Sequence, residues 1–223
     1  MAGFRPRGSA LTRGNIAHLL RQPFFAPMRL FALCLLAATL VVPASVLAQA
    51  SPTIDVGGAK IEVDNFVVGH RVPLNGAGVR AEGDAKLYVA ALYVSRKSRS
   101  LIEVAGAPGP KRLHVQMLRE MEGKLMGAAL SQGMNSNLSA KEVSACLPGV
   151  LKMSELFAVK KKMVAGDSFT LDSVPGQGTV VKVNQEKVAT IDAKEFFGCM
   201  LQVYIGERPA DPKLKAALLG AKV

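Results

Sequence analysis

The sequence predicts an α+β fold in which an antiparallel sheet packs against helices. Runs typical of β-strands come first and return later as a hairpin, whereas segments with helical spacing occupy the middle and the end of the chain. Strands and helices segregated in this way are typical of antiparallel α+β domains. The 173 residues from Ser51 onward are most simply one domain, residues 51–223, with one core.

The first half of this domain is predicted to be rich in strands. Its β-type runs are residues 54–56, 60–63, 86–94 and 112–118. Gly57-Gly58 joins the first two runs as a hairpin. Residues 75–80, Asn-Gly-Ala-Gly-Val-Arg, predict a glycine-rich bend. In residues 86–94 both alternating sets of side chains are apolar, which indicates a central strand that is covered on both faces.

Helices are predicted where small and apolar residues recur at helical spacing. They are residues 122–137, 139–162, 192–205 and a last short helix that starts at Asp211-Pro212. Ser139 and Glu142 form a capping box, and Pro148 is expected to kink or break the helix that follows. Later β-type runs at residues 168–174 and 179–183, with a third short run to Ile191, predict strands between the helices.

The N-terminal segment has the pattern of a secretory signal peptide. Arg29 precedes a run without charged residues from Leu30, and Ala48-Gln49-Ala50 ends it with small residues. We therefore expect residues 1–50 to be removed and the remaining domain to be periplasmic. The alternative is an uncleaved anchor, because about 20 apolar residues can span a bilayer. Contact with a membrane is expected only through this segment.

The start of translation is also predicted to lie within this segment. Met28 alone would give a compact signal sequence, so translation is predicted to begin there.

The net charge of +11 does not by itself indicate a nucleic-acid-binding protein. All five basic residues before Ser51 are arginines and no acidic residue lies there, so 23 basic and 17 acidic side chains remain after it. The chain has no Trp and three Tyr, which argues against a stacking platform for single-stranded nucleic acid. No nucleic-acid partner is predicted.

The cysteines leave open whether a disulfide forms, and the histidines do not predict a metal site. In an oxidising compartment Cys146 and Cys199 could form a disulfide, or each could be a small buried hydrophobic residue. His70 and His114 have no Cys, His or carboxylate at metal-ligand spacing. No nucleotide-binding or metalloprotease motif is present, so neither a cofactor nor a metal is predicted.

Arg80 is the most informative polar residue. It follows the glycine-rich segment and precedes a strand with two apolar faces. An inward-facing guanidinium needs an anion, either an internal acid or a ligand carboxylate, and Tyr88 would supply a phenolic donor to the same group. The alternative is an Arg80 at the sheet edge that pairs with Glu82 or Asp84.

Several motifs resemble, in their order and spacing, those of bacterial chalcone-isomerase-like proteins. They are residues 75–80, Ala90-Ala91-Leu92-Tyr93, Pro108-Gly109-Pro110, residues 117–120 (Met-Leu-Arg-Glu), residues 175–178 (Pro-Gly-Gln-Gly) and the C-terminal stretch from Tyr204-Ile205-Gly206-Glu207 to Gly220. The likeness covers about residues 54–220. It implies an open-faced β-sandwich, in which a large antiparallel sheet faces a layer of helices with a ligand cleft between them.

The same resemblance carries over the catalytic residues less well. In plant chalcone isomerases an Arg on the glycine-rich loop accompanies a Thr, a Tyr, an Asn, and a final Thr or Ser. Arg80 matches the arginine, but Tyr88, Met126, Gly133 and Val203 stand at the other positions. The resemblance therefore implies one cation in an apolar cleft, without chalcone isomerase activity. The plant fatty-acid-binding members of this fold resemble the chain at Arg80 and Tyr88.

We expect the domain to bind a small apolar carboxylate of the fatty-acid type. Arg80 would anchor the anion and Tyr88 would be the second donor, while Met126, Met134 and Val203 would line the apolar part. One alternative is an isomerase or intramolecular lyase on an enone-type substrate, in which Arg80 stabilises an enolate. Another is a non-catalytic envelope interaction module, in which Arg80 is a buried structural cation.

Overall fold

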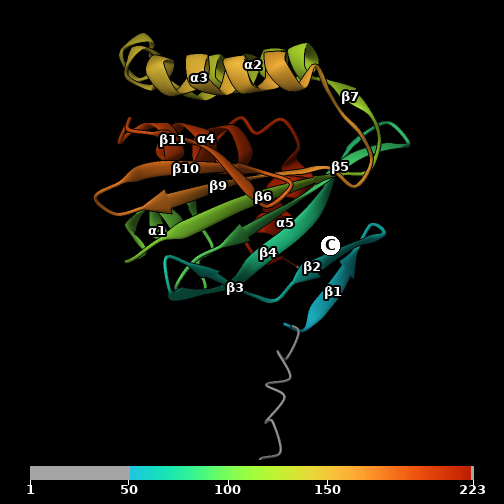
Figure 1. Cartoon of the computed structure of the whole chain (residues 1–223). Helices are drawn as coiled ribbons and strands as arrows, with labels where there is room; N and C mark the ends of the chain where they lie inside the picture. The colour runs from blue at the N-terminus through green and yellow to red at the C-terminus, as the bar shows by residue number, and fades with distance from the viewer. Residues whose placement is uncertain (1–50, 222–223) are drawn as a thin grey trace, which may run out of the picture. The chain divides into compact units, whose positions relative to one another are not determined.

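A seven-stranded antiparallel sheet forms the centre of the computed structural model, which describes residues 51–221 (Figure 1). The predicted signal segment and the proposed start at Met28 lie outside the described residues. The sheet order is β11-β10-β9-β6-β5-β4-β3. Its strands are β3 (Asp64–Val67), β4 (His70–Glu82), β5 (Ala85–Tyr93), β6 (Lys111–Met117), β9 (Ser168–Val174), β10 (Gly178–Val183) and β11 (Glu186–Ile191).

Two short strand pairs stand beside this sheet. The first pair, β1 (Thr53–Val56) and β2 (Ala59–Glu62), is the predicted hairpin at Gly57-Gly58. The second pair, β7 (Met121–Glu122) and β8 (Lys162–Met163), joins the start of one helix to the end of the next. The sequence patterns did not indicate this second pair, because each of its strands has only two residues.

The helices lie mainly on one face of the sheet. They are α1 (Leu101–Gly106), α2 (Gly123–Asn137), α3 (Ala140–Lys160), α4 (Phe196–Ile205) and α5 (Pro212–Leu218). Helices α2 and α3 pack on each other as an outer layer, and α4 lies between them and the sheet (Figure 1). This arrangement confirms the predicted α+β class. No helix within residues 51–221 has the length and apolarity that crossing a membrane would require.

Alternation along the strands gives the sheet two different buried faces. Leu92, Leu113 and Leu171 point toward the helices and belong to the larger hydrophobic core. Val89, Ala91 and Tyr93 point to the other face, where side chains of β1, β2, β3 and the start of β4 cover them. Strand β5 is thus covered on both sides, as the two apolar sets of residues 86–94 predict.

Helix α3 passes through Pro148 as one element, so the break that we considered at this residue does not occur. Contacts on both sides of the proline hold it to α4. Cys146 forms a disulfide with Cys199 of α4, with a distance of 6.5 Å between their Cα atoms. Gly149 lies so close to α4 that an added Cβ would be 2.2 Å from the Phe196 ring. The capping box at Ser139 and Glu142 is present, as predicted.

The glycine-rich segment at residues 75–80 is part of strand β4, so the predicted bend is wrong. The glycines serve a close approach, because a Cβ on Gly76 would lie 2.0 Å from the Ala217 carbonyl oxygen of α5. A Cβ on Gly78 would lie 2.6 Å from the Ala217 side chain. The pairing with β5 shifts register at two points, between Leu74 and Gly76 and between Arg80 and Ala81.

Substitution of Gly76 tests this explanation. We expect Gly76→Ala to lower the free energy of unfolding by about 3 kcal/mol, because a backbone oxygen blocks the new methyl group. The matched control is Gly127→Ala in α2, where an added Cβ meets no atom within 4 Å. The control should gain roughly 0.5–1 kcal/mol from its reduced chain entropy. Urea unfolding measures both, and equal stability of the two variants would contradict the close approach of α5.

Candidate functional site

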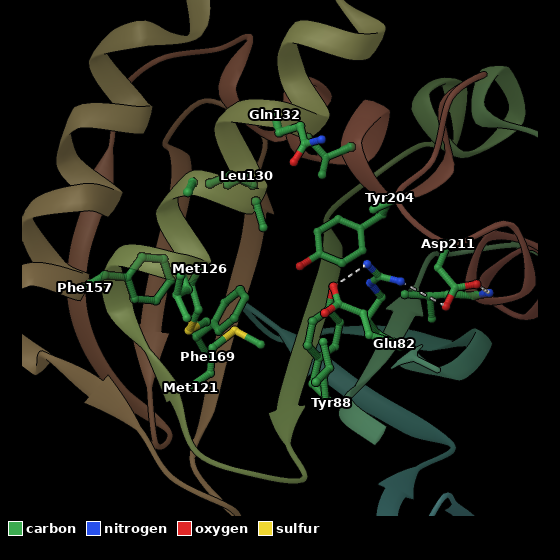
Figure 2. Close-up of a pocket in the computed structure, with 18 of the residues that line it drawn as sticks. Glu82, Tyr88, Met121, Met126, Leu130, Gln132, Phe157, Phe169, Tyr204 and Asp211 are labelled. Atoms are coloured by element: carbon green, nitrogen blue, oxygen red, sulfur yellow. Dashed lines mark hydrogen bonds and ion pairs between the residues drawn. The ribbon is translucent and has the colours of Figure 1, made fainter. Parts of the chain in front are cut away.

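A hollow of about 730 Å³ lies between the helix-covered face of the sheet and the helices (Figure 2). Its walls come from β4, β5 and β9 of the sheet and from α2, α3, α4 and the start of α5. Most of the lining is apolar. The apolar side chains include Leu87, Met121, Leu125, Met126, Leu130, Met153, Phe157, Phe169, Leu171, Met200, Val203 and Leu214.

Arg80 and Tyr88 supply polar groups at one end of this cavity. The register of β4 and β5 pairs Arg80 directly with Tyr88. Side chains of directly opposed residues share one face of a sheet and lie next to each other. Both residues line the cavity, on the same face as Ala90 and Leu92. The register therefore brings together two side chains that the sequence could only place on neighbouring segments.

The Arg80 guanidinium is paired with two carboxylates. Its Nη2 donates to Oε1 of Glu82 at 3.0 Å, and its Nη1 lies 3.6 Å from Oδ2 of Asp211 (Figure 2). Nη1 also donates to the Ala81 carbonyl at 2.9 Å. The exposed fraction of the Arg80 side chain is 17%. Arg80 thus faces the cavity and also has the pairing with Glu82 that the alternative interpretation predicted.

Asp211 is held in place by backbone donors. Its Oδ1 accepts from the amides of Lys213 and Leu214 at the start of α5, at 2.8 and 3.0 Å. Its Oδ2 accepts from the Ala81 amide at 3.4 Å, at the register shift in β4. Burial by itself would raise the pKa of Asp211, but these amides and the charge of Arg80 together lower it. The ionised carboxylate therefore ties the last helix to the strand that carries Arg80.

A second phenol, Tyr204 of α4, lies beside Tyr88 in the cavity wall. Burial raises the pKa of Tyr88, although the charge of Arg80 and a hydrogen bond with Tyr204 oppose this rise. Burial also raises the pKa of Tyr204 well above its usual value. Both phenols stay protonated at neutral pH, so each keeps an O–H group that can donate a hydrogen bond.

Four of the five residues that the sequence suggested for a site line this cavity, namely Arg80, Tyr88, Met126 and Val203. Met134 does not line it and belongs to the hydrophobic core, with 3% of its surface exposed. The cavity ends before Met134 because α2 closes onto α4 there. A Cβ on the neighbouring Gly133 would lie 2.6 Å from Cγ1 of Val203, which leaves no open space.

Sequence reasoning did not single out several cavity residues as site residues. Tyr204, Asp211, Gln132 and Arg119 supply polar groups, and Phe157 and Phe169 form an edge-to-face pair in the wall. The Asp-Pro pair at residue 211 did identify a helix cap, and Tyr204 lies in one of the motifs quoted for the family resemblance. Nothing in the sequence showed that these segments meet at the end of β4.

A second hollow, of about 440 Å³, lies on the opposite face of the sheet and is mainly polar. Arg112 lines it and donates to both oxygens of Asp172, with Asn65 as a further partner. His114 contacts Oγ1 of Thr170 through Nδ1, at 2.9 Å. No group of three metal-ligating side chains occurs within residues 51–221. Arg112 and Asp172 are both buried and hold each other, whereas the Glu82 partner of Arg80 is largely exposed, so we take the apolar cavity as the candidate site.

His114 should make the stability of the domain depend on pH. Burial, together with the charge of Arg112, lowers the pKa of His114 to about 4, although Asp172 opposes this. An unfolded histidine has a pKa of about 6.5, so the unfolded chain binds more protons between these values. The contribution of neutral His114 is therefore fully present above pH 6.5 and is lost as the pH falls toward 4.

We expect the contribution of His114 to the free energy of unfolding to fall by about 2 kcal/mol between pH 7.5 and pH 5. Urea unfolding at the two pH values should show a smaller difference in His114→Gln than in the wild type. His70→Gln, a change at an exposed histidine, should retain the wild-type dependence. If His114→Gln showed the same difference in unfolding free energy between the two pH values as the wild type, His114 would not be a buried neutral imidazole.

Comparison with known proteins identifies one family and one fold. A family model described as chalcone isomerase-like matches residues 53–220. Among solved structures, a fatty-acid binding protein of Arabidopsis thaliana is similar, with 13% sequence identity and a TM-score of 0.56. The match covers 75% of this chain and 96% of that protein. A search of curated protein sequences finds no match. The family and the fold that the sequence motifs suggested are confirmed.

Proposed function

We propose that this chain, which belongs to the chalcone isomerase-like family, binds a small apolar carboxylate of the fatty-acid type in its cavity. The observation that carries the proposal is the pairing of Arg80 with Tyr88 at one end of an otherwise mainly apolar hollow. The structurally similar Arabidopsis thaliana protein, which is named as a fatty-acid binding protein, supports the same ligand class.

The apolar part of the cavity suits a hydrocarbon chain. Its volume of about 730 Å³ lies within the usual range of small-molecule pockets. Three methionines on three helices, Met126, Met153 and Met200, contribute to the wall. Methionine is flexible and polarisable and adapts to an irregular ligand shape. Each CH₂ group that leaves water for such a wall contributes about 0.8 kcal/mol.

The polar end of the cavity suits a carboxylate head group. A guanidinium binds carboxylates through charge-assisted hydrogen bonds, which are stronger than bonds between neutral groups. Tyr88 and Tyr204 add protonated hydroxyls beside it. Because Tyr204 and Tyr88 share a hydrogen bond, one of their two O–H groups remains for a ligand. One end of the ligand would therefore meet a cation and one O–H donor, and the rest would meet apolar side chains.

A catalytic function on an enone-type substrate has less support from the cavity wall. A Michael cyclisation needs donors that hold the attacking phenolate and the forming enolate in fixed positions. The wall offers Met126 and Val203 at positions where the resemblance implies polar groups in plant enzymes. Arg80 and the two tyrosines gather at one end, which favours binding of a single polar group.

Removal of the guanidinium tests the binding proposal. Native mass spectrometry of gently purified protein should show a bound fatty acid in the wild type. In Arg80→Ala the Kd for the acid should rise about 10- to 100-fold, the cost of one charge-assisted hydrogen-bonding group. Arg71→Ala is the matched control, because Arg71 lies on the same strand, is exposed and pairs with Asp64.

Equal ligand occupancy in Arg80→Ala would remove Arg80 from the site. Absence of a bound acid together with turnover of an enone-type substrate would favour the isomerase. If neither ligand nor turnover is found and Arg80→Ala mainly lowers stability, Arg80 has a structural role, as in an envelope interaction module.

We also propose that the domain is exported to the periplasm after cleavage at Ala50. The charge and apolar pattern of residues 1–50 supports this, and so does the disulfide between Cys146 and Cys199. Disulfides persist in oxidising compartments and are rare in the cytosol.

The intact mass of the protein from a periplasmic extract tests export. We expect a chain that starts at Ser51 and is lighter by two hydrogens than its reduced form. A cytosolic protein that retains residues 28–50 would contradict the proposal.

A further inference from the structure

Arg80, which would bind the ligand head group in the proposed function, already binds a carboxylate of the chain itself. Glu82 Oε1 accepts from Nη2 of Arg80 at 3.0 Å, and both side chains line the cavity. An incoming acid therefore meets an arginine whose charge is already paired. How the ligand gains access to that charge depends on which of the two carboxylates, Glu82 or Asp211, can leave.

Asp211 cannot leave without breaking other contacts. It accepts hydrogen bonds from the backbone amides of Ala81, Lys213 and Leu214, and 12% of its side chain is exposed. Its movement would uncap α5 and leave the partly buried amides of Ala81 and Leu214 without these acceptors. Asp211 therefore stays beside Arg80 whether or not a ligand is bound.

Glu82 is held much less firmly. The exposed fraction of its side chain is 65%, and within residues 51–221 its carboxylate makes a hydrogen bond or ion pair with Arg80 alone. It is the last residue of β4, beside a turn at Gly83. Ion pairs with such an exposed partner contribute little to stability, because water and salt compete for them. Glu82 can turn into solvent at small cost.

The position of Glu82 matches that expected for a ligand head group. Glu82 bonds to Nη2 of Arg80 and Asp211 lies beside Nη1, so the two carboxylates approach different nitrogens of the guanidinium, as the dashed lines in Figure 2 show. The charge of Glu82 also acts on Tyr88. Glu82 and Tyr88 both line the cavity. A ligand carboxylate that used the Tyr88 hydroxyl and Arg80 together would occupy the place that Glu82 holds.

We infer that Glu82 is an internal competitor for Arg80 and that a carboxylate ligand binds by exchange with it. This inference rests on the proposed function. Exchange leaves the partly buried arginine with two carboxylates before and after binding, so entry of the ligand does not reduce the pairing of its charge. A neutral ligand, such as an alcohol or an ester, cannot replace the charge of Glu82. Such a ligand leaves Glu82 on Arg80, so Glu82 lowers the affinity of the site for acids and not for neutral ligands.

The test compares Glu82→Gln with Glu120→Gln. Glu120 also lines the cavity and is exposed, but it pairs with Lys162 and not with Arg80. Both changes remove one negative charge from the rim, so any general effect of charge appears in both variants. Calorimetry at pH 8 on delipidated protein measures the Kd of dodecanoic acid, which is ionised there, and of 1-dodecanol, which is neutral.

We expect Glu82→Gln to lower the Kd of dodecanoic acid about three- to fivefold, the range that release of a weak ion pair permits. The Kd of 1-dodecanol should stay the same, and Glu120→Gln should change neither value by more than about twofold. Glu82→Ala removes the carboxylate without adding an amide. Like Glu82→Gln, it should lower the Kd of dodecanoic acid and leave the Kd of 1-dodecanol unchanged.

Two results would overturn the inference and leave the proposed function standing. In the first, the wild type binds the acid and both Glu82 variants bind it with equal or lower affinity. In the second, Glu120→Gln strengthens binding as much as Glu82→Gln. If neither the wild type nor Glu82→Gln binds the acid, the proposed function fails together with this inference.

Discussion

The carboxylate of Asp211 joins two parts of the molecule that are distant in sequence, the start of α5 and the end of β4. It caps α5, accepts from the Ala81 amide at the register shift of β4, and lies beside the Arg80 guanidinium. A buried cation requires a fixed anion, and a helix start requires an acceptor for its first amides. One side chain meets both requirements. The direction in which Arg80 points therefore depends on the docking of the last helix.

That docking depends in turn on the two glycines of β4. Without side chains at Gly76 and Gly78, the backbone of α5 can lie directly on the strand. Asn75 strengthens this contact, because its side chain donates to the Leu218 carbonyl at the end of α5 at 2.8 Å. Strand β4 thus holds α5 at one end and presents Arg80 to the cavity at the other.

The two faces of the sheet differ in polarity, although the same strands form both. On the helix side, alternate residues of β5, β6 and β9 are apolar, and a cavity remains between them and the helices. On the other side, β6 and β9 carry paired polar groups, such as Arg112 with Asp172 and His114 with Thr170. Polar groups that satisfy each other stabilise the sheet. Arg80, in contrast, combines a fixed partner with an exposed one.

Local patterns in the sequence determined much of the fold. Alternation identified β5 as a central strand, the capping box located the start of α3, and Asp211-Pro212 located the start of α5. These predictions succeeded because each depends on residues that are close in sequence. The family resemblance succeeded for a similar reason, since it rests on the order and spacing of short motifs. It also identified Arg80 as a candidate before any contact was known.

Only the tertiary structure decided the rest. Residues 75–80 form a strand and not a bend because α5, far along the chain, packs against their glycines. Met134 lies in the core because Gly133 brings α2 onto α4. The pairing of Arg80 with Tyr88 follows from strand register, and its pairing with Asp211 joins segments about 130 residues apart. Periodicity reports which face of an element is apolar, whereas these contacts depend on how the elements dock.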